Sequence, residues 1–151
     1  MCSSDLKNCG YIQQRTDERG GPVLSSIKEA CFRGNKEGLQ GITIYGEVSG
    51  RYIPQELNYR AFSHFLFNPE DSLRDFARVG LAPIVGGEEL SQIYIELLAK
   101  IEGESMTNRD IKELTRITDK FRRSARFGSN WGAYHRWQWL CTYANLEGSS
   151  V

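Results

Sequence analysis

The chain has 151 residues, of which 40% are hydrophobic, and it carries 19 basic and 19 acidic side chains. A chain of this length can form one domain that buries roughly 70% of its unfolded surface. The net charge of zero provides no overall field for nucleic acid or a membrane, and no apolar run approaches the roughly 20 residues of a membrane helix. The composition therefore predicts a soluble protein with no membrane partner.

Residues 1–6 (MCSSDL) resemble the translation of a common sequencing-adapter end. We expect them to be a non-native or disordered tail. The chain is then a metagenomic fragment that lacks its true N-terminus and any signal peptide, so its cellular compartment is unknown.

A strand, a helix and a second strand are predicted in that order after the tail. Residues 8–14 (NCGYIQQ) suit a short strand, and Pro22 begins a helix whose apolar stripe ends near Gly38, a residue suited to closing a helix. Residues 42–45 (ITIY) are rich in β-branched side chains, as strands are. This order is typical of a βαβ unit in a parallel sheet.

Beyond residue 45 the pattern becomes helical. Apolar periodicity and breaking residues predict helices at 55–67, 72–79, 88–102, 109–125 and 131–146. Thr107, followed three residues later by Asp110, forms an N-cap pair for the fourth of them. Two strands are too few for a sheet that five helices could cover, which indicates the end of a larger α/β domain.

Four segments resemble the last strand and helix of (β/α)₈ glycoside hydrolases, in particular α-glucuronidase-like and hexosaminidase-like barrels. They are residues 41–49 (GITIYGEVS), 56–62 (ELNYRAF), 67–69 (FNP) and 81–83 (LAP). The resemblance implies that residues 7–69 are the last one or two β/α units of a TIM barrel. Residues 70–151 are then a helical C-terminal extension. The fold class expected from the resemblance is an α/β fragment that is mostly helical.

The same resemblance implies a carbohydrate substrate, held at the barrel mouth by polar residues that follow the strands. The candidate substrate-binding residues are Glu47, Tyr45, Asn58, Glu56, Tyr59 and Arg15. The catalytic acid and base are unknown, because barrels of this kind carry them on earlier strands that this chain lacks. We therefore expect a hydrolase fragment with little turnover of its own, no cofactor and a tendency to self-associate.

Structural interpretations compete with these roles. Glu47 could cap a loop, and Glu56 suits the first turn of a helix through the helix dipole. Asn58 and Tyr59 could face either the barrel mouth or a packing surface. His64 lies among apolar residues and is predicted to be a packing histidine held by a hydrogen bond, and Arg15 could remain in solvent. The four cysteines show neither CxxC spacing nor clustering with a histidine, so no metal site is predicted.

Residues 120–139 suggest a function of another class. They carry five cations and no acid, interleaved with six aromatic residues, a pattern typical of surfaces that bind single-stranded nucleic acid. The sequence favours a simpler interpretation, in which Trp131, Tyr134, Trp137 and Cys141 form a buried helical stripe and the arginines are solvated. The alternative to a hydrolase is thus a non-enzymatic helical interaction module, with nucleic acid as its less favoured ligand.

Overall fold

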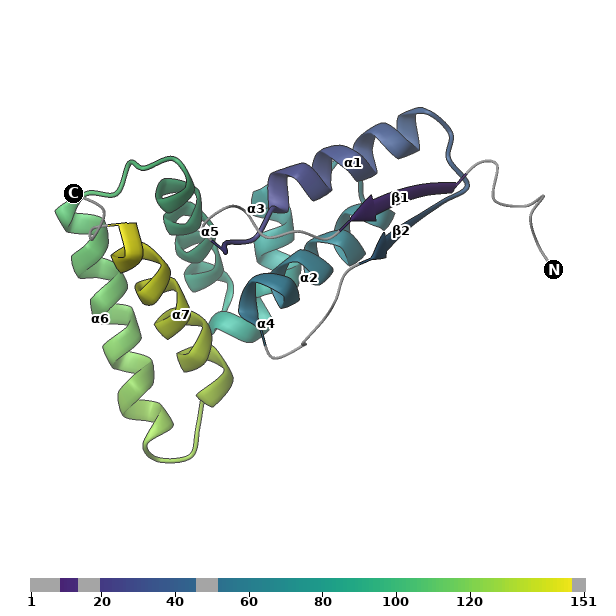
Figure 1. Ribbon diagram of the computed structural model, residues 1–151. Coiled ribbons are helices and arrows are strands. Elements are labelled where there is room, and N and C mark those ends of the chain that lie inside the picture. The colour runs from purple at the N-terminus through teal and green to yellow at the C-terminus, as the bar shows by residue number, and fades with distance from the viewer. Residues whose placement is uncertain (1–8, 14–19, 46–51, 148–151) are drawn as a thin grey trace. The chain divides into compact units, whose positions relative to one another are not determined.

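The computed structural model describes residues 9–13, 20–45 and 52–147 (Figure 1). The chain divides into two compact units, residues 1–76 and 77–151. The elements of the first unit are, in order, β1 (Cys9–Gln13), α1 (Leu24–Lys36), β2 (Gly41–Tyr45), α2 (Ile53–Phe67) and α3 (Leu73–Phe76).

The two strands pair in parallel, in a register that places Cys9 opposite Gly41 and Gln13 opposite Tyr45. A parallel pair needs a long crossover connection, and α1 supplies it. The connection turns sharply at Gly38, where φ is +70°, a conformation that glycine adopts without steric cost. The N–H of Leu39 then donates to the carbonyl of Gly34 at 2.9 Å, which satisfies a carbonyl at the end of α1.

Helices α1 and α2 pack against each other and bury the core of this unit. The buried apolar side chains are Leu24, Ile27, Cys31, Leu57, Ala61, Phe65 and Phe76. Phe65 and Phe76 lie 5.7 Å apart between ring centroids, so α3 is fastened to α2 through aromatic contacts. The first unit thus has a core of its own.

The barrel expected from the resemblance to glycoside hydrolases is wrong. A TIM barrel closes eight parallel strands, each followed by a helix. The described residues contain one short strand pair, and every element after β2 is helical. Residues 7–69 are therefore not the terminal β/α units of a barrel, because α1, α2 and α3 bury their apolar faces on one another and on the strand pair instead of covering a larger sheet.

The second unit is entirely helical in its described residues. Its elements are a π-helical turn η1 (Ala77–Leu81), α4 (Ala82–Val85), α5 (Glu88–Glu102), α6 (Asn108–Ala125) and α7 (Trp131–Glu147). The single helix predicted at 72–79 is in fact α3 followed by η1, and Pro83 stands in the first turn of α4. Proline has no N–H to continue a helical ladder, which explains the change of helix type before it.

Trp137 on α7 is the centre of this second core. Its indole Nε1 donates a hydrogen bond to the carbonyl of Val85 at 2.9 Å. Its ring meets the Tyr94 ring edge-on, with 5.0 Å between centroids, and is stacked on the Phe121 ring, with 6.5 Å between centroids. Tyr94 in turn donates its hydroxyl to the carbonyl of Arg136 at 3.3 Å. One side chain therefore joins α4, α5, α6 and α7.

The N-terminus of α6 carries the capping box predicted from Thr107 and Asp110. The Asp110 carboxylate accepts from the Thr107 backbone N–H at 2.9 Å, and the Thr107 hydroxyl accepts from the Asp110 N–H at 3.2 Å. Lys100 at the end of α5 adds an ion pair to Asp110 at 2.5 Å. The hydrogen bond from Lys100, and after it those from Thr107, lower the pKa of Asp110 from 3.8 to about 2.

This lowered pKa predicts an acid-sensitive contribution to stability. Because the pKa is lower in the folded state, the ionised Asp110 stabilises the fold fully above about pH 4, and the effect is lost as pH falls toward 2. We expect Asp110→Asn to cost about 1 kcal/mol at pH 7 and progressively less below pH 4. Urea unfolding followed by circular dichroism across this range measures the difference.

The matched control is Asp119→Asn. Asp119 pairs with Arg122 at 2.7 Å on the exposed side of the same helix, and such surface pairs contribute about 0 to 1 kcal/mol. An Asp110→Asn variant that unfolds at the same urea concentration as Asp119→Asn at pH 7 would contradict the role of the capping box.

Candidate functional site

Of the residues predicted to bind a sugar, Glu56, Asn58 and Tyr59 lie on α2 in the described part of the chain. Glu47 and Arg15 lie outside the described residues, and Tyr45 is placed only as the last residue of β2. Glu56 lies in the first turn of α2, where its carboxylate accepts from Arg60 Nε at 3.1 Å, one turn further on. Tyr59 is half-buried on the same helix.

Asn58 is fully buried and has a structural partner. Its side-chain oxygen accepts a hydrogen bond from the backbone N–H of Val23 at 2.8 Å. Val23 is the N-cap of α1 and provides no side-chain cap itself. Asn58 thus satisfies a backbone donor at the start of α1, a group that would be costly to bury without a partner.

His64 packs against aromatic rings as predicted, but its Nε2 does not make the expected hydrogen bond with any described residue. Its ring meets Phe65 edge-on at 5.0 Å and Phe76 at 5.6 Å, and its side chain is 8% exposed. Nε2 lies 3.1 Å from an Asp71 carboxylate oxygen, although not in hydrogen-bond geometry. The contacts with two aromatic rings explain why this histidine is buried.

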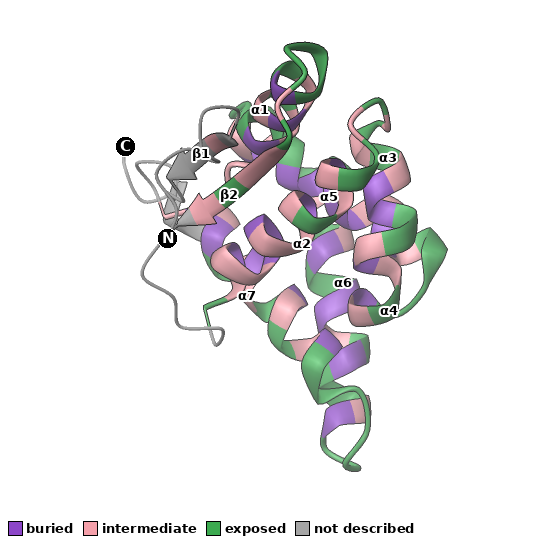
Figure 2. Cartoon of the chain, turned by 90° about the vertical axis from the view of Figure 1, so that its right-hand side faces the viewer, coloured by how far each residue is buried: buried purple, intermediate pink, exposed green. Residues whose placement is uncertain are grey.

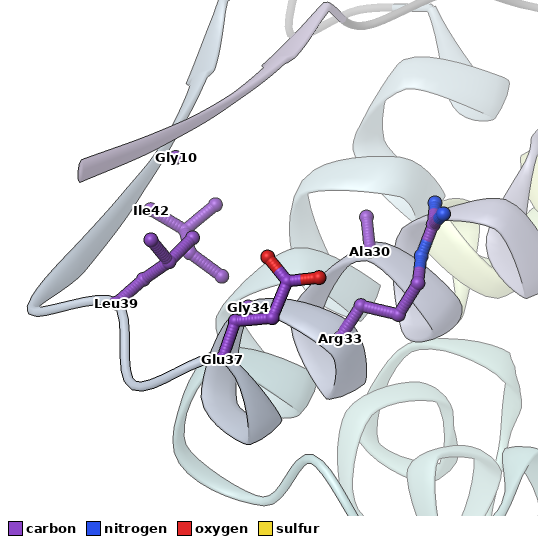
Figure 3. Close-up of a pocket in the computed structure, with 7 residues that line it drawn as sticks. All are labelled: Gly10, Ala30, Arg33, Gly34, Glu37, Leu39 and Ile42. Atoms are coloured by element: carbon purple, nitrogen blue, oxygen red, sulfur yellow. The ribbon is translucent and has the colours of Figure 1, made fainter. Parts of the chain in front are cut away.

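The first unit contains a shallow pocket of about 200 Å³ beside the strand pair (Figure 3). Its lining consists of Gly10, Ala30, Arg33, Gly34, Glu37, Leu39 and Ile42. In Figure 3 the Leu39 and Ile42 side chains lie together, and Arg33 points away from them. A Cβ on Gly34 would come within 2.5 Å of Ile42, so the glycine allows α1 to approach β2 closely. This lining provides no histidine, cysteine or hydroxyl group that could act as a nucleophile, and its one carboxylate is that of Glu37.

The second unit exposes a more distinctive surface at the turn between α6 and α7, which we call the hairpin tip and define as residues 122–136. Figure 1 shows the two helices side by side and joined by this turn, and Figure 2 shows the turn as exposed. Phe127 is 89% exposed and Trp131 is 53% exposed. Large aromatic side chains are normally buried, so two exposed ones within five positions form an unusual surface.

Hydrogen bonds hold the tip in a defined conformation. The N–H of Phe127 donates to the carbonyl of Ser124 at 3.1 Å, and the N–H of Gly128 donates to that of Ala125 at 3.0 Å. Gly128, with φ +80°, lets the chain reverse after α6. Phe127 is therefore presented to solvent by an ordered turn.

Three arginines lie close in sequence to these aromatic side chains. Arg122, Arg123 and Arg126 are all exposed, and neither Arg123 nor Arg126 makes an ion pair with a described residue. The six-residue interval from Arg126 to Trp131 contains no acid. The tip thus combines positive charge with accessible aromatic faces.

Trp131 belongs to a small aromatic cluster on the first turn of α7. Its ring lies 5.9 Å from Tyr134 and 5.9 Å from His135, measured between centroids. Arg136 is anchored next to the cluster by a hydrogen bond from Nη1 to the carbonyl of Gly132 at 2.7 Å. The neighbours fix the orientation of the Trp131 ring while part of it remains open to solvent.

The buried stripe expected on α7 differs from the observed one. The buried side chains are Ala133, Trp137, Leu140 and Tyr143, whereas Tyr134 and Cys141 are only partly buried. The helix is rotated so that Trp131 lies outside the core. Sequence reasoning identified the basic and aromatic composition of residues 120–139 but assigned Trp131 to the wrong face.

No helix in the described ranges is long and apolar enough to cross a membrane. The described residues also contain no group of three or more histidine, cysteine, aspartate or glutamate side chains that could hold a metal ion. No protein-family model, no curated protein and no solved structure matches the chain.

Proposed function

We propose that this chain is a helical interaction module that binds single-stranded nucleic acid at the hairpin tip. The observation that supports the proposal is the exposure of Phe127 and Trp131 within a few positions of the exposed Arg123 and Arg126. Residues 120–139, which include all four, contain no acid. Unpaired bases stack on aromatic side chains, and each stacked base contributes about 1 to 3 kcal/mol. Arginines bind the phosphates that connect these bases.

The combination of positive charge and exposed aromatic rings favours this ligand over a protein partner. A protein surface that matched the tip would need several acids around an apolar pocket. A nucleic-acid strand provides both a negative phosphate and the flat face of a base at every nucleotide. A duplex fits less well, because its bases are stacked on one another and their faces are not accessible to Phe127 or Trp131. The ligand is therefore single-stranded.

The test is a titration of the full chain into a fluorescein-labelled oligothymidylate, followed by anisotropy at about 50 mM and about 200 mM salt. We expect binding that weakens with salt, and an affinity about fivefold to a hundredfold lower for Trp131→Ala. The tryptophan emission of the chain should also be quenched on binding, and this quenching should be lost in Trp131→Ala, since a stacked base contacts that indole directly.

Phe67→Ala is the matched control, because Phe67 is 78% exposed but lies on α2, in the other unit. Circular dichroism of each variant checks that its helices are retained. Equal affinities for Trp131→Ala and the unmodified chain would overturn the proposal, and so would an absence of binding at the lower salt concentration.

A further inference from the structure

The exposed face of α6 carries a row of cations that leads to the hairpin tip. Five basic residues recur every three or four positions, and we call them the basic stripe: Arg109, Lys112, Arg116, Lys120 and Arg123. At 3.6 residues per turn these positions fall within an arc of about 80°. All five are exposed.

The opposite face of α6 is the buried one. Leu114, Ile117, Phe121 and Ala125 pack into the core of the second unit. Burial of this apolar face fixes the rotation of the helix, so the stripe cannot turn inward. The stripe therefore faces solvent because the apolar face of α6 is buried, and not because of its own charges.

Most cations of the stripe are not paired with a described acid. Lys112, Lys120 and Arg123 make no ion pair with any described residue, while Arg116 is paired with Glu113 through two hydrogen bonds of 3.0 and 2.7 Å. Residues 108–139 contain eight lysines and arginines against three acids, although the chain as a whole is neutral. The positive charge of the chain is thus concentrated in α6 and the tip.

We infer that the basic stripe is the backbone track for the strand whose bases stack at the tip, an inference that rests on the function proposed above. The stripe extends over 14 residue steps, which is about 21 Å of helix. A stacked strand advances about 3.4 Å per nucleotide along its axis, so the stripe spans about six nucleotides. Stacking at the tip and phosphate contacts along α6 make one continuous site.

A track along α6 predicts that affinity depends on the length of the nucleic-acid strand. Oligothymidylates of about 4 nucleotides reach only the tip, whereas those of about 10 nucleotides also cover α6. We expect the longer strand to bind at least tenfold more tightly, and the gain to disappear in the double variant Lys112→Gln, Lys120→Gln. Lys36→Gln on α1 in the other unit is the matched control.

Salt dependence provides the second measurement. For single strands the slope of log affinity against log salt changes by about 0.7 for each phosphate contact removed. The double variant should therefore flatten the slope by about 1.4, whereas Trp131→Ala should weaken binding with little change of slope. Arg116→Gln should change the slope less than either lysine, because Glu113 already neutralises Arg116.

The outcomes separate the two proposals. If the short and long strands bind equally and the lysine variants keep the original slope, the track along α6 is refuted while binding at the tip stands. If neither strand binds, the proposed function itself fails.

Discussion

Replacing Trp137 by alanine is expected to lower the free energy of unfolding of the second unit by about 3 to 5 kcal/mol. The indole is fully buried, touches Tyr94 and Phe121, and donates to the carbonyl of Val85. Its removal leaves a cavity between four helices and a buried carbonyl without its donor. Since domains are stable by about 5 to 15 kcal/mol, this loss is a large part of the total.

Urea unfolding followed by far-ultraviolet circular dichroism measures this loss. Trp137→Phe separates the two causes: it keeps most of the ring volume but removes the hydrogen bond, and it should cost about 1 to 3 kcal/mol. Trp131→Ala is the surface control and should cost less than about 1 kcal/mol. Similar unfolding midpoints for Trp137→Ala and Trp131→Ala would contradict the central place of Trp137 in the core.

The second large effect is expected at Gly86, which ends α4 with φ +107°. A Cβ at this position would lie 2.4 Å from the ring of Phe121 and 3.1 Å from Leu90. Alanine there would suffer both the strain of a left-handed backbone, about 1 to 2 kcal/mol, and overpacking of about 1 to 3 kcal/mol. We expect Gly86→Ala to destabilise the chain by about 2 to 5 kcal/mol.

Gly128, in the same unit, is the control for backbone strain. It has φ +80°, but a Cβ built there meets nothing within 4 Å. Gly128→Ala therefore reports the strain of a positive φ without a clash, and the difference between the two variants in thermal or urea unfolding reports the clash. Phe121→Leu should recover part of that difference in the Gly86→Ala background, since the two sites are in contact. Equal costs at Gly86 and Gly128 would refute the clash with Phe121.

Local signals predicted the helices of the second unit well. The helix predicted at residues 88–102 has the bounds of α5, and those of α6 and α7 differ by one residue at one end. Periodic apolar residues and the Thr107 cap are local features, and they specify a helix wherever the chain is placed. Local signals of this kind could not specify the number of strands in the first unit.

The barrel was inferred from short motifs around β2 and α2, and these motifs do not determine a fold. A β-branched run that leads into a helix suits any parallel strand, whether its sheet has two strands or eight. Pairing between distant segments decides the number of strands, and the described residues pair only β1 with β2. Asn58 shows the same limit, because its contact with Val23 joins residues 35 positions apart.

The sequence by itself determined where the helices lie, how α6 is capped and that positive charge and aromatic rings gather in residues 120–139. Tertiary structure alone decided which of those rings are buried. Aromatic side chains recur around much of α7, so its own periodicity does not select an inner face; packing on α4 and α6 selects Trp137 and leaves Trp131 in solvent. The hairpin tip is therefore a product of packing, because burial is settled by the partners of a helix as well as by its pattern.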